Sequence, residues 1–177
     1  MMQNISHKIF ISFILILFAL FSFFYGFYVD EIPMGSGGYN GDFDFVKKSI
    51  NIFSNNSLND SILLFSDTSN RTPLIYILHK LLNPFFENSN NYRLIVFFIS
   101  LIVPVLFFLC LVEKFKKTDK VLLGLLASTI FFNPFYRNSS FWGLEENYAI
   151  ITCLLSFLFL LKLQKQKIGK PSKIYVY

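Results

Sequence analysis

Charged residues are scarce in this chain of 177 residues. Asp, Glu, Lys and Arg make up 15% of it, hydrophobic residues 54% and aromatic residues 19%. A soluble domain carries about 25% charged residues, and a domain of about 150 residues leaves roughly 30% of its chain surface in water. The low charge therefore excludes an ordinary water-soluble domain, and the apolar content excludes a disordered chain. This composition predicts an all-α membrane protein with several spans.

Cysteine is almost absent, and so are the common catalytic motifs. Cys110 and Cys153 both lie inside apolar runs, where cysteine behaves as a small hydrophobe, so neither a disulfide nor a metal pair is expected. The sequence contains no glycine-rich phosphate loop, no Cys/His metal spacing and no Ser-His-Asp order. The net charge of +5 suits the cytoplasmic loops of a membrane protein, so no nucleic-acid partner is predicted.

Four apolar runs predict four transmembrane helices. They cover residues 9–29, 94–112, 121–136 and 148–161. The first run is longer than the roughly 7–15 apolar residues of a signal peptide, which favours an uncleaved anchor. Pro104 inside the second run predicts a kink, because a neighbouring helix can satisfy the carbonyl that proline leaves free. The fourth run is short and could gain length by starting near Phe141.

Lysine and arginine are distributed unevenly between the connecting segments. Ten of the 16 lie in residues 1–8, 113–120 and 162–177, and the other six lie in the longer segments 30–93 and 137–147. Cytoplasmic loops carry an excess of these cations. This bias predicts a cytoplasmic N-terminus, an external loop at 30–93, and an integral protein of the bacterial inner membrane with membrane lipid as a partner.

The predicted external loop carries two expected helices. The first covers residues 42–53, where four apolar residues fall on one face: Phe43, Val46, Ile50 and Phe53. The polar stretch 54–71 is expected to be a surface loop. Thr72-Pro73 then predicts the start of a second helix, which Asn83-Pro84 ends. The apolar surface of this second helix suits the outer membrane interface.

Two acidic pairs lie at the predicted outer membrane surface. Asp30 and Glu31 directly follow the first run, and Glu145 and Glu146 precede the fourth. One interpretation is ordinary interfacial solvation. The other is that the two pairs converge on one external cavity, where they could supply a general base or hold a divalent metal against a phosphate leaving group.

Other candidate residues lie in the same external segments. Arg71 and Arg137 could bind a phosphate in a bidentate manner. Asp42 and Asp44 are at the start of the first predicted loop helix, where carboxylates interact favourably with the helix dipole. His79 lies on the second predicted loop helix, and a structural role is favoured for it.

This layout resembles the N-terminal part of C-type glycosyltransferases, multispanning enzymes that use polyprenyl-phosphate sugars. In the group that includes the lipid A aminoarabinose transferases and protein mannosyltransferases, an Asp-Glu pair follows the first span and a Lys-Pro-Pro-Leu-like motif opens a loop helix. Four stretches correspond here: Asp30-Glu31, Arg71-Thr72-Pro73-Leu74-Ile75-Tyr76, Tyr92-Arg93-Leu94, and a second external loop from Asn133 to Asn147. Two departures are Arg71 in place of lysine and Thr72 in place of the first proline.

The resemblance implies an inverting sugar transfer from a polyprenyl-phosphate donor to an acceptor on the external face. The implied catalytic residues are Asp30 with its neighbour Glu31, or Asp42, because a glycine-rich insert leaves two registers open. Four further residues would position the acceptor or a metal, or stabilise the departing phosphate: Glu145, Glu146, Arg71 and Arg137. Members of the group differ in their need for a metal, so a divalent metal remains an open cofactor.

Family enzymes have more spans, so this chain is expected to be an N-terminal fragment or one piece of a split enzyme. The alternative is a non-enzymatic four-span scaffold, or part of a lipid or polysaccharide transporter. Transporters place ionisable residues near the membrane midplane. The four apolar runs have no charge in their interiors, which disfavours transport.

Overall fold

A computed structural model describes the backbone of residues 2–168 and the side chains of residues 7–164. This part of the chain is helical and contains no strand, which confirms the predicted all-α class. Its elements in chain order are α1 (Met2–Tyr28), the π-helix η1 (Tyr39–Phe43), α2 (Asp44–Asn55), α3 (Leu58–Thr68), α4 (Leu74–Leu82), α5 (Ser89–Ser100), α6 (Ile102–Lys114), α7 (Lys120–Ser128), the 3-10 helix η2 (Thr129–Phe132), α8 (Pro134–Trp142) and α9 (Glu146–Ile168).

Three helical segments are long and apolar enough to cross a membrane. They are His7–Tyr28, Ser89–Lys114 and Glu146–Gln164, and they overlap three of the four predicted runs. A helix rises 1.5 Å per residue, so about 20 residues match a hydrocarbon layer of about 30 Å. The remaining apolar helix, Lys120–Phe132, is shorter.

The predicted run 121–136 does not form a single helix. The side chain of Asn133 accepts a hydrogen bond from the backbone N–H of Tyr136 at 3.1 Å, which caps the start of α8. Pro134 then occupies the first turn of α8, where its missing N–H costs nothing. The apolar helix therefore stops at Phe132, and the prediction was wrong at this end.

The fourth predicted run does not gain length near Phe141 either. Gly143 has a φ of 74°, a left-handed conformation that ends α8. The N–H of Leu144 then donates to the carbonyl of Ser139 at 3.0 Å. Because the chain turns here, α9 begins only at Glu146, and the additional helical length lies at the other end, beyond the predicted limit.

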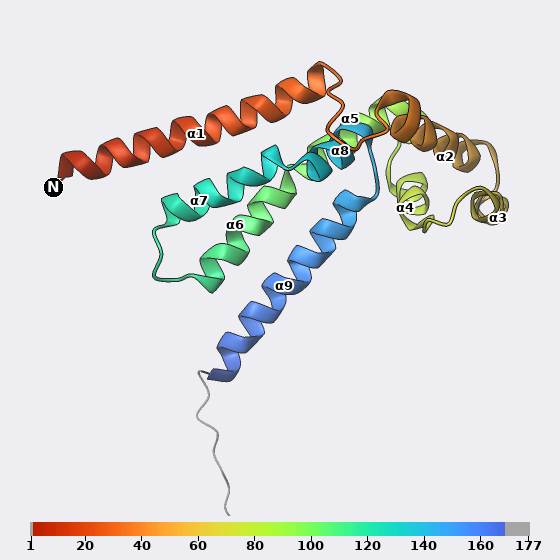
Figure 1. Ribbon diagram of the computed structural model, residues 1–177. Coiled ribbons are helices and arrows are strands. Elements are labelled where there is room, and N and C mark those ends of the chain that lie inside the picture. The colour runs from red at the N-terminus through yellow and green to blue at the C-terminus, as the bar shows by residue number, and fades with distance from the viewer. Residues whose placement is uncertain (1, 169–177) are drawn as a thin grey trace, which may run out of the picture.

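The long helices pack side by side in the order α1, α7, α6, α9. The N-terminal end of α1, the connection between α6 and α7, and the C-terminal end of α9 all lie away from α2, α3 and α4 (Figure 1). The two ends of the molecule therefore correspond to the lysine-rich segments and to the predicted external loop. Most of the predicted tail 162–177 lies outside the residues whose side chains are described.

The second span is kinked, as Pro104 predicts. Proline has no backbone N–H, so the carbonyl of Ser100 loses its helical partner, and the chain turns at Leu101 between α5 and α6. The hydroxyl of Tyr136 in α8 donates to the Ser100 carbonyl at 2.8 Å. A neighbouring helix thus supplies the missing donor, as the sequence predicts.

Replacing Tyr136 with phenylalanine should leave the Ser100 carbonyl buried without this donor. An unsatisfied buried group costs about 1–3 kcal/mol, so Tyr136→Phe is expected to lower the unfolding midpoint of the purified protein in mild detergent. The matched control is Tyr25→Phe, because Tyr25 is exposed on α1. Equal midpoints for the two variants would show that this hydrogen bond does not stabilise the kink.

The first predicted loop helix is confirmed and begins one turn earlier, in η1. Its four predicted apolar residues are all completely buried: Phe43, Val46, Ile50 and Phe53. The prediction of a surface loop over 54–71 was wrong, because this stretch contains α3. Ser57 caps α3 by accepting a hydrogen bond from the backbone N–H of Asp60 at 3.3 Å.

The second predicted loop helix is α4, which starts at Leu74 and ends before Asn83. It begins after Pro73 rather than at it, so the predicted start was early by one residue. Its inner face is buried, but an outer stripe stays exposed: Leu74, Leu78, Leu81 and Leu82. Such an apolar stripe on a helix too short to span suits the membrane interface.

Candidate functional site

Asp30 lies in the turn after α1 and has an unusual backbone conformation. Its φ is 53°, which non-glycine residues rarely adopt. One carboxylate oxygen, Oδ1, accepts a hydrogen bond from Arg93 Nη2 at 2.6 Å. The other oxygen has no hydrogen-bond partner in the described part of the chain, and the side chain is 57% exposed. Asp30 is therefore held at one oxygen and accessible at the other.

Arg93 is the residue that holds Asp30, and the sequence analysis assigned it no role. Its Nε donates to the carbonyl of Phe141 at the end of α8. Three aromatic rings surround its guanidinium: the ring centroids of Trp142, Phe27 and Phe43 lie 4.5, 4.6 and 5.5 Å away. These cation–π contacts orient the arginine. The signals in the sequence were its position directly before a long apolar run and its place in the Tyr92-Arg93-Leu94 stretch.

Glu31 is paired with the second buried arginine, Arg137 of α8. Arg137 Nε donates to Glu31 Oε1 at 3.0 Å, and Nη2 contacts the other carboxylate oxygen. The same guanidinium donates to the carbonyls of Phe131 at 2.9 Å and Ser22 at 3.2 Å. Gly26 provides the space, because a Cβ there would collide with both charged groups. This pair joins α1 to α8.

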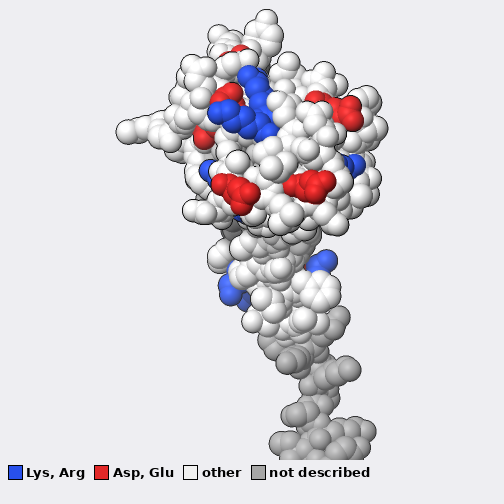
Figure 2. Space-filling model, turned by 90° about the vertical axis from the view of Figure 1, so that its right-hand side faces the viewer, with Lys and Arg blue, Asp and Glu red and all other residues white. Residues whose placement is uncertain are grey.

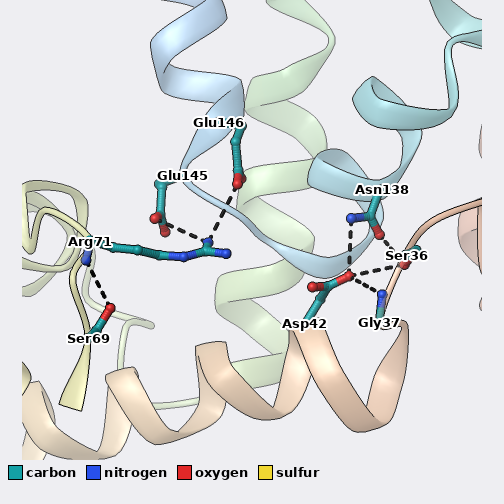
Figure 3. A network of polar contacts seen from close by, with 8 residues as sticks. All are labelled: Ser36, Gly37, Asp42, Ser69, Arg71, Asn138, Glu145 and Glu146. Atoms are coloured by element: carbon teal, nitrogen blue, oxygen red, sulfur yellow. Dashed lines mark hydrogen bonds and ion pairs between the residues drawn. The ribbon is translucent and has the colours of Figure 1, made fainter.

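Asp42 lies in a separate network and cross-links a loop to α8. Its Oδ2 accepts hydrogen bonds from the Gly37 N–H at 2.8 Å, the Ser36 hydroxyl at 3.1 Å and the Asn138 amide at 3.1 Å (Figure 3). Asp44 instead forms an exposed ion pair with Lys48. Three contacts at one oxygen of Asp42 join the loop to α8 and describe a structural role, whereas Asp30 makes a single ion pair with Arg93.

Arg71 lies between the two glutamates at the start of α9, Glu145 and Glu146. Its Nη1 is 3.2 Å from Glu145 Oε1 and 3.5 Å from Glu146 Oε1 (Figure 3). These three side chains line a cavity of about 470 Å³ whose other walls include Ile75 and Tyr148. Pockets of about 300–1,000 Å³ hold small molecules. Asp30 and Glu31 are not among the lining residues, so the two acidic pairs do not share this cavity.

The charges in this cavity favour hydroxyl groups. Glu145 Oε2 and Glu146 Oε2 are buried without a hydrogen-bond partner. Burial raises the pKa of Glu145, and the positive charge of Arg71 opposes that shift. Two carboxylates with unused acceptor oxygens and one arginine with several donors can bind a polyol by accepting and donating hydrogen bonds. With both carboxylates ionised, the three charges sum to −1, and a net negative charge repels a phosphate. Phosphate binding by Arg71 therefore stays a prediction.

Most acidic residues and all three arginines belong to the segments at the broad end that holds α2, α3 and α4. Figure 2 shows basic side chains at the centre of this end with acidic side chains around them, above a mostly uncharged stalk. Within the part of the chain that the structure describes, no group of three or more His, Cys, Asp or Glu side chains is placed to hold a metal ion.

The backbone links the Asp30 ion pair to the cavity of Arg71. A Cβ placed at Gly143 would lie 3.6 Å from the Cα of Arg93, and Glu145 follows two residues later.

Comparisons of the chain with protein-family models, with curated proteins and with solved structures find no match. No function can therefore be transferred by similarity, and the site geometry is the basis for one.

Proposed function

We propose that this chain is the catalytic part of a membrane glycosyltransferase that moves a sugar from a polyprenyl-phosphate donor to an external acceptor. The observation that carries the proposal is the cavity of Arg71, Glu145 and Glu146 at the start of the α9 span. Its unused carboxylate oxygens suit sugar hydroxyls. Its position beside a membrane-spanning helix suits a sugar that is attached to a lipid.

The proposed reaction needs one base. The acceptor hydroxyl attacks the anomeric carbon of the sugar, the bond from that carbon to the phosphate oxygen breaks, and polyprenyl phosphate leaves with the bonding electrons. Asp30 does not line the cavity of the sugar, so the proposal needs an acceptor that reaches the sugar from the side of Asp30. Asp30 then takes the proton of the acceptor hydroxyl through its accessible oxygen, while Arg93 holds the other oxygen. Glu31 is the neighbour that fixes the end of α1 through Arg137.

The proposed topology has four spans, with Lys120–Phe132 as a short fourth crossing beside α1 and α6. In it, the N-terminus and the α6–α7 connection are cytoplasmic and α2, α3 and α4 are external, in a bacterial inner membrane. The support is that the N-terminal end of α1, the α6–α7 connection and the described end of α9 all lie away from α2, α3 and α4 (Figure 1).

Cysteine labelling tests this orientation. A membrane-impermeant maleimide should label Ser57→Cys in intact cells and label Lys117→Cys only after the membrane is opened, because both positions are exposed in the structure. Labelling of Lys117→Cys in intact cells would reverse the orientation.

Sugar transfer is tested in membranes from the source cells, where any further segment or subunit is present. Wild-type membranes should release polyprenyl phosphate from a radiolabelled polyprenyl-phosphate sugar. Arg71→Ala should lower that rate at least tenfold, because charge-assisted hydrogen bonds contribute about 1.5–3 kcal/mol. The matched control is Lys48→Ala, which removes an exposed cation of the same end. Equal rates for both variants would argue against the cavity as the sugar site.

A scaffold is the second candidate function. Each of the three arginines at this end is paired with a carboxylate: Arg71, Arg93 and Arg137. In a scaffold, these ion pairs would do nothing more than join helices. All of the acidic residues in them would then be structural. The transferase predicts that polyprenyl phosphate is released only by membranes that contain this protein. The scaffold predicts the same release with and without it.

A further inference from the structure

A second cavity lies beside the cavity of Arg71 and shares one residue with it. It measures about 320 Å³, and its apolar walls come from α4 and α5: Leu78, Leu82, Ile95 and Ile99. Tyr148 of α9 lines both cavities. A cavity that contains three charged side chains and an apolar cavity therefore share one lining residue, Tyr148.

The hydroxyl of Tyr148 is oriented by His79 and Asn83. The backbone N–H of Phe85 donates to Asn83 Oδ1 at 3.0 Å, which fixes the orientation of the Asn83 amide. The amide nitrogen therefore donates to His79 Nδ1, also at 3.0 Å. Since Nδ1 accepts this bond, the proton of a neutral His79 is on Nε2. Burial lowers the pKa of His79 to about 4, so the ring is neutral at neutral pH.

The proton on His79 Nε2 decides the role of Tyr148. Nε2 and the Tyr148 hydroxyl are hydrogen-bonded, and Nε2 must be the donor in this bond. The tyrosine oxygen accepts it, so the hydroxyl proton of Tyr148 is available to another acceptor. In the described part of the chain, this hydroxyl has no hydrogen-bond partner besides His79. A ligand oxygen at the junction of the two cavities can accept it.

We propose that Tyr148 donates a hydrogen bond to the phosphate of a sugar-phosphate lipid whose sugar occupies the Arg71 cavity and whose chain occupies the apolar cavity. His79 is the positioning residue for this hydroxyl. The proposal rests on the proposed transferase, and it adds the group that contacts the leaving phosphate. A donor placed at that oxygen stabilises the negative charge that develops when the bond to the sugar breaks.

Binding of two probes tests the role of Tyr148. The purified full chain is placed in phosphatidylcholine nanodiscs and titrated with decyl glucosyl phosphate and with decyl glucoside, which lacks the phosphate. Tyr148→Phe should weaken binding of the phosphate probe about ten- to hundredfold and change binding of the glucoside little. Tyr28→Phe is the matched control, because Tyr28 is exposed at the end of α1.

Two variants of His79 test its positioning role. His79→Leu removes the donor to Tyr148 and should also weaken the phosphate probe selectively. His79→Gln can still donate an amide N–H to the tyrosine and should restore most of the affinity. If Tyr148→Phe binds both probes as the wild type does, or loses both equally, or if the wild type does not bind the phosphate probe, the proposal is wrong.

The outcome for Tyr148 is separate from the outcome for sugar transfer. Transfer that depends on Arg71, combined with unchanged probe binding in Tyr148→Phe, would reject the role of Tyr148 and keep the transferase. Probe binding that depends on Tyr148, combined with no transfer in wild-type membranes, would reject the transferase and keep a site for a phosphate-bearing lipid.

Discussion

Asp30→Asn is expected to slow sugar transfer by about 10²–10⁴-fold, the usual cost of losing a general base. Asparagine can still accept the hydrogen bond from Arg93 through its amide oxygen, so the end of α1 should keep its structure. It cannot take up a proton at the accessible position. The rate is measured as release of polyprenyl phosphate in membranes that contain equal amounts of wild-type and variant protein.

Two other aspartates provide the controls for this prediction. Asp44→Asn should change the rate little, because the Asp44 side chain is 45% exposed and forms an ion pair with the exposed Lys48. Asp42→Asn decides between the two sequence registers. If Asp42→Asn loses transfer and Asp30→Asn retains it, the base is Asp42. Full transfer by the Asp30→Asn, Asp42→Asn double variant would remove both residues from the chemistry.

Arg137→Met is expected to lower the free energy of unfolding by about 3–5 kcal/mol, the cost of breaking a buried ion pair. The Arg137 side chain is only 7% exposed. Methionine fills a similar volume but leaves Glu31 without its partner. It also leaves the carbonyls of Phe131 and Ser22 without their donor. Denaturation of the purified protein in mixed micelles measures the change.

The matched control for this variant is Arg71→Met. The Arg71 side chain is 41% exposed, and exposed ion pairs contribute about 0–1 kcal/mol. Glu145, whose side chain is 15% exposed, also loses a partner in this variant, so Arg71→Met should lose some stability but less than Arg137→Met. If Arg137→Met were as stable as Arg71→Met, the link between α1 and α8 would not depend on the buried pair.

Much of the architecture could be predicted from composition and periodicity. Long apolar runs predict helices that cross a membrane, because only a helix satisfies its own backbone in lipid. The apolar stripe of α2 was identified correctly because its burial follows the helical period. The missed helix α3 has a weaker signal: apart from Ser61 and Phe65 its residues are at least partly exposed, so the stretch resembles a loop in the sequence.

The sequence by itself determined the class of the protein, the positions of its apolar runs and the identity of its acidic and basic candidates. Only the tertiary structure decided which charges meet. Arg93 and Asp30 are 63 residues apart in the chain, and Arg137 and Glu31 are 106 apart. These pairs form because α5 and α8 pack next to the C-terminal end of α1. That arrangement follows from packing among distant helices, which local periodicity does not encode.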